Sequence, residues 1–170
     1  MFNEVFDLVM KLEGGFVLHK NATEEAQTYA GIYRVAHPNW IGWTYLDEGE
    51  TPPIGLVREV YIQEYWDKIK LEDSVIKGII FEYGVNTGID EAIKTAQRVL
   101  GLKEDGQIGP ITQKAVQESS VGKFLAVYSI ERTKRYSKLA NKNPNKYGIY
   151  LRGWVNRVLE SYEWFKNYNV

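Results

Sequence analysis

The residue with the clearest chemical potential in this chain is Glu13, in the stretch KLEGGFV. It stands where a helical pattern of apolar residues stops and Gly14-Gly15 begins. The partial negative charge at a helix C-terminus favours the protonated form of a carboxylate placed there. A carboxylic acid that keeps its proton is what a glycosidase uses to protonate a leaving-group oxygen. The position therefore suggests a general acid, and the alternative is a solvated acid in front of a glycine helix stop.

The composition narrows the chemistry that the other residues could perform. The chain has no cysteine and only two histidines, His19 and His37, so a thiol nucleophile and a His-rich zinc site are both disfavoured. No GxSxG-type elbow is present. We therefore expect neither a metal nor an organic cofactor. A formal net charge of −1 also argues against a nucleic-acid partner.

Apolar residues recur at helical spacing along most of the chain, which predicts a mainly α fold of about seven helices. A small irregular or β-hairpin segment is expected near residues 16–33. The expected helices cover residues 3–12 and 55–68, segments that begin near 74, 90 and 110, residues 121–141, and a last segment from about 150. Glycine stops after residues 13 and 100, Asp73 or Ser74 as a cap and Pro110 as a first helical residue support these limits.

Five ordered segments carry a family resemblance. They are EGGFV after the first helix, TYAGI from residue 28, YWDKI from residue 65, the long run FEYGVNTGIDEAIKTAQRVLGLKEDGQIGPIT from residue 81, and RGWVNRV from residue 152. Together they resemble the bacterial and phage N-acetylmuramidases of glycoside hydrolase family 108. The resemblance implies a lysozyme-like helical fold. It also implies a catalytic segment over residues 1–75 and a peptidoglycan-binding-like segment over 76–170, packed as one compact unit.

The resemblance implies specific catalytic residues. It makes Glu13 the general acid, and Thr28, fifteen positions later, matches a threonine that holds the attacking water in phage-type lysozymes. One departure concerns the aspartate that many family members carry nine positions after the acid, because Ala22 stands there. Glu24 or Glu25 could supply this second carboxylate, and the alternative is that both are solvated loop acids.

Further residues are candidates for contacts with a glycan. Aromatics make up 14% of the chain, more than a core alone explains, and aromatic rings stack on sugars. The substrate-binding candidates are Tyr29, Tyr33, Trp43, Glu82 and Asn86. For Trp43 the alternative is that it covers the core under a long loop. Glu82, where the family more often has Asp, could be buried in a polar network near the cleft, and Asn86 could organise a turn.

The resulting hypothesis is a peptidoglycan hydrolase that cleaves the β-1,4 bond between N-acetylmuramic acid and N-acetylglucosamine. A lytic transglycosylase, which works with one glutamate, is the alternative enzyme. A catalytically weak peptidoglycan-binding or secretion-associated module is the non-enzymatic alternative. The expected partners are peptidoglycan glycan strands, and we expect a monomer.

The N-terminal sequence bears on where the protein acts. MFNEVFDLVMK has no basic region followed by a long apolar run, so no signal peptide is predicted. No stretch approaches 18 apolar residues, so no transmembrane segment is predicted. We expect synthesis in the cytoplasm and access to the cell wall through a holin or other export machinery.

Overall fold

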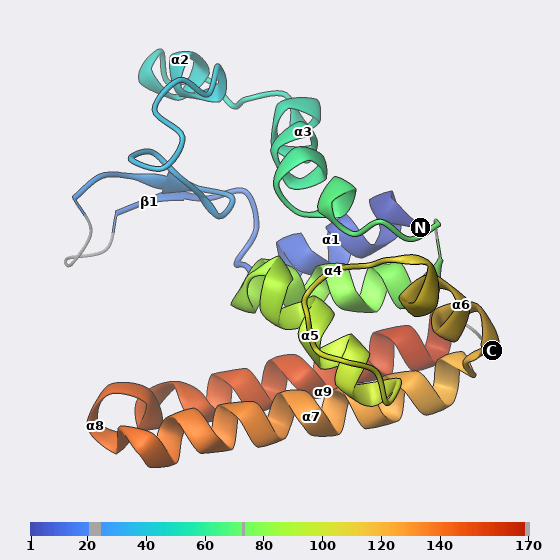
Figure 1. Ribbon diagram of the computed structural model, residues 1–170. Coiled ribbons are helices and arrows are strands. Elements are labelled where there is room, and N and C mark those ends of the chain that lie inside the picture. Colours follow the sequence, from blue (N-terminus) through green and yellow to red (C-terminus); the bar gives the residue numbers. More distant parts are fainter. Residues whose placement is uncertain (21–24, 73, 169–170) are drawn as a thin grey trace. The chain divides into compact units, whose positions relative to one another are not determined.

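The computed structural model describes residues 1–20, 25–72 and 74–168. Helices dominate it, as Figure 1 shows, which confirms the mainly α fold class. The strands are short and form one antiparallel sheet in the order β1, β2, β3. They are β1 (Leu18–His19), β2 (Thr28–Tyr29) and β3 (Ile32–Tyr33). The sheet lies within the segment for which a hairpin or irregular structure was expected.

The chain divides into two compact units. The first unit is Phe2–Lys68, and the second unit is Ile69–Val170 together with Met1. The change of unit thus falls at Lys68, a few residues before the limit at residue 75 that the motifs suggest.

The first unit contains α1 (Phe2–Leu12), α2 (Gly42–Asp47), α3 (Ile54–Glu64) and a 3-10 turn, Trp66–Lys68. The apolar face of α1 is buried, as its spacing predicts. The helix ends because Gly14 and Gly15 both take the left-handed conformation, with φ values of 86° and 82°. The Gly15 amide then donates to the Met10 carbonyl at 2.8 Å, which closes the last turn.

A tight turn joins β2 to β3 and is braced by α3. Ala30 and Gly31 have φ values of 48° and 77°, the pair of positive values that a two-residue hairpin requires. The Tyr61 hydroxyl donates to the Ala30 carbonyl at 3.0 Å. Tyr61 also meets the ring of Phe6 edge-on at 5.4 Å. One tyrosine therefore ties the hairpin to both α3 and α1.

Gly31→Ala is expected to lower the free energy of unfolding by about 1–3 kcal/mol. A methyl group at this position would overlap the Tyr61 hydroxyl, and the backbone conformation there strains any residue except glycine. Urea unfolding would measure the change. Gly55→Ala is the matched control, because no atom lies within 4 Å of a Cβ at Gly55, which is helical. Equal stability of the two variants would contradict this account of the turn.

All the regular secondary structure described in the second unit is helical, and residues 100–109 form an irregular connection between two of its helices. Its elements are α4 (Val75–Thr87), α5 (Ile89–Val99), α6 (Pro110–Glu118), α7 (Val121–Lys142), α8 (Pro144–Tyr147), a 3-10 turn (Gly148–Tyr150) and α9 (Leu151–Tyr168). The long helices α7 and α9 lie side by side, and α5 packs on α4 (Figure 1). Ser74 caps α4 and Pro110 is the first residue of α6, as the sequence predicts.

An ion cluster of Glu82, Arg132, Arg157 and Ser161 joins three helices of the second unit. Its centre is Glu82 on α4, whose side chain is 0% exposed. The Glu82 carboxylate accepts from Arg132 Nη1 at 2.6 Å, from Arg157 Nε at 2.9 Å and from Ser161 Oγ at 2.9 Å. Burial by itself would raise the pKa of Glu82, but the two guanidinium charges outweigh it and hold the pKa below its usual range. Glu82 is therefore buried in a polar network, as one of its two predicted roles has it, and these contacts favour that structural role over a contact with substrate.

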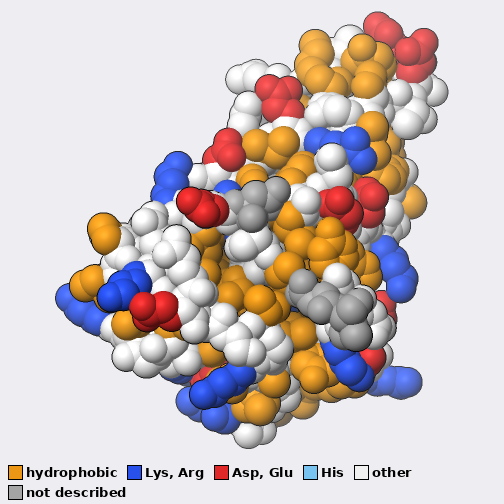
Figure 2. Space-filling view, turned by 90° about the vertical axis from the view of Figure 1, so that its right-hand side faces the viewer, with side chains coloured by type: hydrophobic (Ala, Val, Ile, Leu, Met, Phe, Trp, Pro, Cys, Tyr) orange, Lys and Arg blue, Asp and Glu red, His pale blue; other side chains and the backbone are white. Residues whose placement is uncertain are grey.

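The surface mixes apolar and charged side chains. On the face that Figure 2 presents, hydrophobic side chains are exposed between acidic and basic ones. Among the described residues, none of the helices combines the length and the apolar character needed to cross a bilayer.

Candidate active site

The first unit contains a cavity of about 690 Å³ whose lining is rich in polar groups. Four residues that the sequence singled out lie around it, namely Glu13, Glu25, Thr28 and Tyr33. His19, Gly31 and Val35 complete the described lining. The structure thus brings together the predicted acid, one of the two predicted second carboxylates and the predicted water-holding threonine.

Glu13 reaches the cavity from the end of α1. Its amide donates to the Val9 carbonyl at 2.9 Å, which makes it the first residue after the helix, and its side chain is half-buried. Within the described part of the chain, no atom lies within 4 Å of a Cβ built on Gly14 or Gly15. The two glycines therefore end the helix through their conformation and leave the space beside the acid open.

Tyr65 is a neighbour of Glu13 that was not among the candidate residues predicted from the sequence. Burial raises the pKa of Tyr65, and the negative charges of Glu13 and Glu64 raise it further. Its ring stacks on Tyr61 at 5.6 Å. The signal for this residue was available, because Tyr65 opens the YWDKI motif.

The sheet presents a row of three side chains to the cavity. His19 pairs with Thr28 across β1 and β2, and Thr28 pairs with Tyr33 across β2 and β3. Residues paired directly across strands point to the same face. The three side chains therefore line one side of the cavity together, and Thr28 at the centre is 9% exposed.

On the opposite face of the sheet, Tyr29 and Ile32 are buried while Leu18 is exposed. Side chains alternate along a strand, so Tyr29 points away from the cavity that Thr28 lines. Its ring is 3% exposed and stacks on Trp40 at 6.1 Å. The structure thus gives Tyr29 a packing role in place of the predicted contact with substrate.

Trp43 is also buried, with 4% of its surface exposed. Its indole N–H donates to the His37 carbonyl at 2.7 Å, and the guanidinium of Arg34 lies 5.1 Å from its ring. Trp40 meets it edge-on at 5.1 Å. These contacts favour the alternative stated for Trp43, a core residue under the loop, over a glycan contact.

Of the two glutamates predicted as a second carboxylate, only Glu25 lies within the described residues. Glu25 is exposed and lines the cavity. Glu24 and Ala22 lie outside the described residues.

Asn86 belongs to the second unit, and its described contact is structural. Its side-chain oxygen accepts a hydrogen bond from the Tyr136 hydroxyl. Tyr136 is 1% exposed, so the bond anchors α4 to α7 inside that unit. The described contact therefore assigns Asn86 to helix packing, and its predicted contact with substrate stays a prediction.

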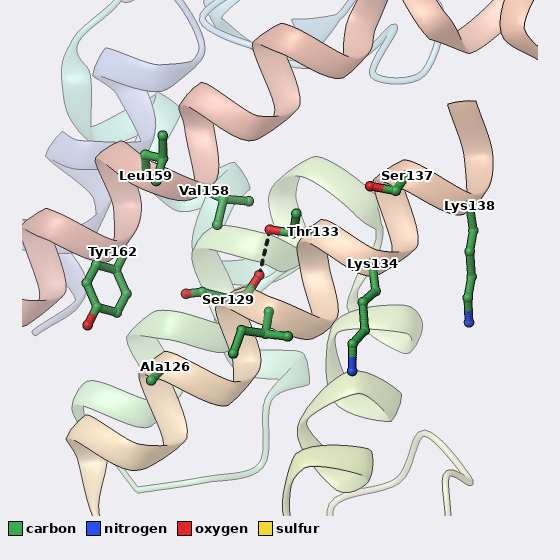
Figure 3. Close-up of a pocket in the computed structure, with 10 residues that line it drawn as sticks. Ala126, Ser129, Thr133, Lys134, Ser137, Lys138, Val158, Leu159 and Tyr162 are labelled. Atoms are coloured by element: carbon green, nitrogen blue, oxygen red, sulfur yellow. Dashed lines mark hydrogen bonds between the residues drawn. The ribbon is translucent and has the colours of Figure 1, made fainter. Parts of the chain in front are cut away.

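The second unit has a groove of its own between α7 and α9, shown in Figure 3, with a volume of about 690 Å³. Ile130 and Leu159 line it and are 53% and 58% exposed. Lys134 and Lys138 also line it, and Thr133 Oγ1 donates to the Ser129 carbonyl within it at 2.9 Å. Its described lining contains no carboxylate and no histidine, whereas the cavity of the first unit has Glu13, Glu25 and His19 in its lining.

In comparisons with known proteins, the two parts of the chain match two different families. Residues 6–88 match the family described as glycosyl hydrolase 108, and residues 91–159 match the family described as predicted peptidoglycan domain. A search of curated proteins found no similar sequence.

A solved structure, that of Brucella abortus SagA, has a similar fold. It superposes with a TM-score of 0.70 at 20% sequence identity, over 98% of this chain and 94% of that one. At this level of identity the similarity describes the fold only. By its two family matches, the chain joins a glycosyl hydrolase 108 segment to a predicted peptidoglycan domain.

Proposed function

We propose that this protein is an N-acetylmuramidase that hydrolyses the β-1,4 bond between N-acetylmuramic acid and N-acetylglucosamine. The two family matches support a glycoside hydrolase that acts on peptidoglycan. The observation that carries the finer proposal is the cavity in which Glu13, Glu25 and Thr28 meet. Its residues all lie in the segment that matches the glycosyl hydrolase family.

In this mechanism Glu13 donates its proton to the glycosidic oxygen, and the bond from that oxygen to the anomeric carbon breaks. Thr28 holds the water that attacks this carbon from the opposite face, so the configuration inverts. Glu25 supplies a second carboxylate, whose negative charge stabilises the positive charge that develops on the sugar ring. The protein would reach its substrate in the cell wall through a holin or other export machinery.

The test is the digestion of purified peptidoglycan followed by mass spectrometry of the fragments. Hydrolysis gives fragments with free reducing ends, and the α anomer of the new end at early times would indicate inversion. A 1,6-anhydro end would identify a lytic transglycosylase instead. Unchanged turbidity of purified walls would favour the binding module.

Two substitutions of Thr28 distinguish the contribution of its hydroxyl group to turnover from the contribution of its shape. Thr28→Val keeps the branched side chain but cannot hydrogen-bond to water, so we expect up to a roughly tenfold loss of turnover, corresponding to one hydrogen bond. Thr28→Ser keeps the hydroxyl and should retain most activity. Initial rates on purified walls measure both variants. Equal activity of the two would mean that Thr28 only braces the turn.

A further inference from the structure

Among the titratable groups of the described cavity lining, the imidazole of His19 has no role in the sequence motifs or in the proposed mechanism. We propose that His19 is a catalytic residue that takes the proton from the attacking water. The inference rests on the proposed muramidase function and names the base that this function leaves open. The carboxylate that many family members place at position 22 is replaced here by Ala22.

The strand register places His19 beside the residue that holds the water. His19 is the direct partner of Thr28 in the antiparallel pair β1–β2. In such pairs the two Cβ atoms stand about 4.5–5.5 Å apart on the same face of the sheet. A water held by the Thr28 hydroxyl is therefore within reach of the imidazole, and both side chains line the cavity.

The backbone near His19 favours the tautomer that a base needs. His19 Nδ1 lies 3.4 Å from the Val17 carbonyl, so a proton on Nδ1 has an acceptor. With that proton in place, Nε2 keeps its lone pair and can accept a proton from water. His19 is exposed, so it can pass this proton on to solvent after each turnover.

The complete step balances in protons and bonds. The Glu13 carboxylic acid gives its proton to the glycosidic oxygen, and the bond between that oxygen and the anomeric carbon breaks. The water oxygen forms the new bond to the anomeric carbon, and one water proton passes to His19 Nε2. Glu13 ends as a carboxylate and His19 as an imidazolium, and exchange with solvent restores both.

The chain offers a matched control, because His37 is the only other histidine. His37 lies in the same unit, and its side chain is not part of the cavity lining. The experiment compares the wild type, His19→Ala, His19→Gln and His37→Ala on purified peptidoglycan between pH 5 and pH 8, the range in which histidine changes charge. Rates are measured with and without added imidazole.

We expect His19→Ala and His19→Gln to lose about 10²-fold or more in turnover, the usual contribution of a general base. Both should also lose the rise in rate with pH that deprotonation of the base gives the wild type. His37→Ala should keep the wild-type rate and pH profile. Added imidazole should restore part of the activity of His19→Ala, because it fits the space that the side chain leaves.

Three results would overturn the inference. The first is an unchanged pH profile in folded His19→Ala, and the second is a change in KM alone, which would make His19 a substrate contact. The third is a failure of imidazole to restore activity while both His19 variants keep the wild-type melting temperature. A wild-type protein without hydrolytic activity would remove the muramidase proposal itself, which distinguishes that failure from a failure of the histidine alone.

Discussion

Glu13→Gln is expected to abolish peptidoglycan hydrolysis while the fold stays intact. The amide has the size and shape of the carboxylic acid but no acidic proton to give to the leaving oxygen. General acid catalysis typically raises the rate about 10²–10⁴-fold, so the rate of the variant should be lower than that of the wild type by this factor. The measurement is the initial rate of turbidity loss of purified walls, with circular dichroism and a melting curve to verify folding.

Glu48→Gln is the matched control for this substitution. Like Glu13, Glu48 is a glutamate that directly follows a helix of the first unit, since it is the C-cap of α2, but it is exposed and lies outside the described cavity lining. It should keep wild-type activity. Wild-type lysis by a well-folded Glu13→Gln protein would remove the general acid from the mechanism.

Glu82→Gln is expected to lower the free energy of unfolding by about 3–5 kcal/mol, the usual effect of removing one partner from a buried ion pair. The amide would remove the buried negative charge that both Arg132 and Arg157 contact. Glu64→Gln is the control, because the Glu64–Lys68 pair is of similar length, 2.7 Å, but about half exposed. An exposed pair contributes only about 0–1 kcal/mol. Urea unfolding of both variants measures the difference.

The same cluster predicts how stability depends on pH. The pKa of Glu82 in the folded protein lies below its ordinary value of 4.5. The unfolded state therefore takes up the proton first as the pH falls. The stabilisation is complete above the ordinary value and is lost as the pH falls through the folded-state value. Wild type should lose more stability than Glu82→Gln below about pH 4.5, and identical acid profiles would contradict this.

Much of the helical framework could be predicted from the sequence, because its signals are local. Spacing, caps and glycine stops lie within a few residues of each helix end, and Ser74, Pro110 and the Gly14-Gly15 stop all mark the ends that they predicted. The short helix α2 was missed because six residues carry too little periodicity.

The site was predictable where a motif fixes the spacing and less so where tertiary structure decides. Glu13 and Thr28 came from motifs and meet at one cavity. The sequence could not tell which of Tyr29 and Tyr33 faces the cavity, because a strand of two residues gives no alternation from which to infer the orientation of its side chains. Burial of Glu82 depends on two arginines 50 and 75 residues further along the chain, and no local pattern reports such partners.

The Glu82 cluster has a consequence for how the protein is made. A ribosome releases α4 well before α9, so Glu82 can contact Arg157 and Ser161, two of its three side-chain partners, only after 75 and 79 further residues have been synthesised. In a chain interrupted before α9, the Glu82 carboxylate would keep Arg132 but lack Arg157 and Ser161. The surfaces of α4 and α7 that α9 covers would be exposed. Such fragments are expected to be degraded by cellular proteases. The ion cluster thus makes the stability of the second unit depend on the synthesis of α9, which favours survival of copies that contain this helix.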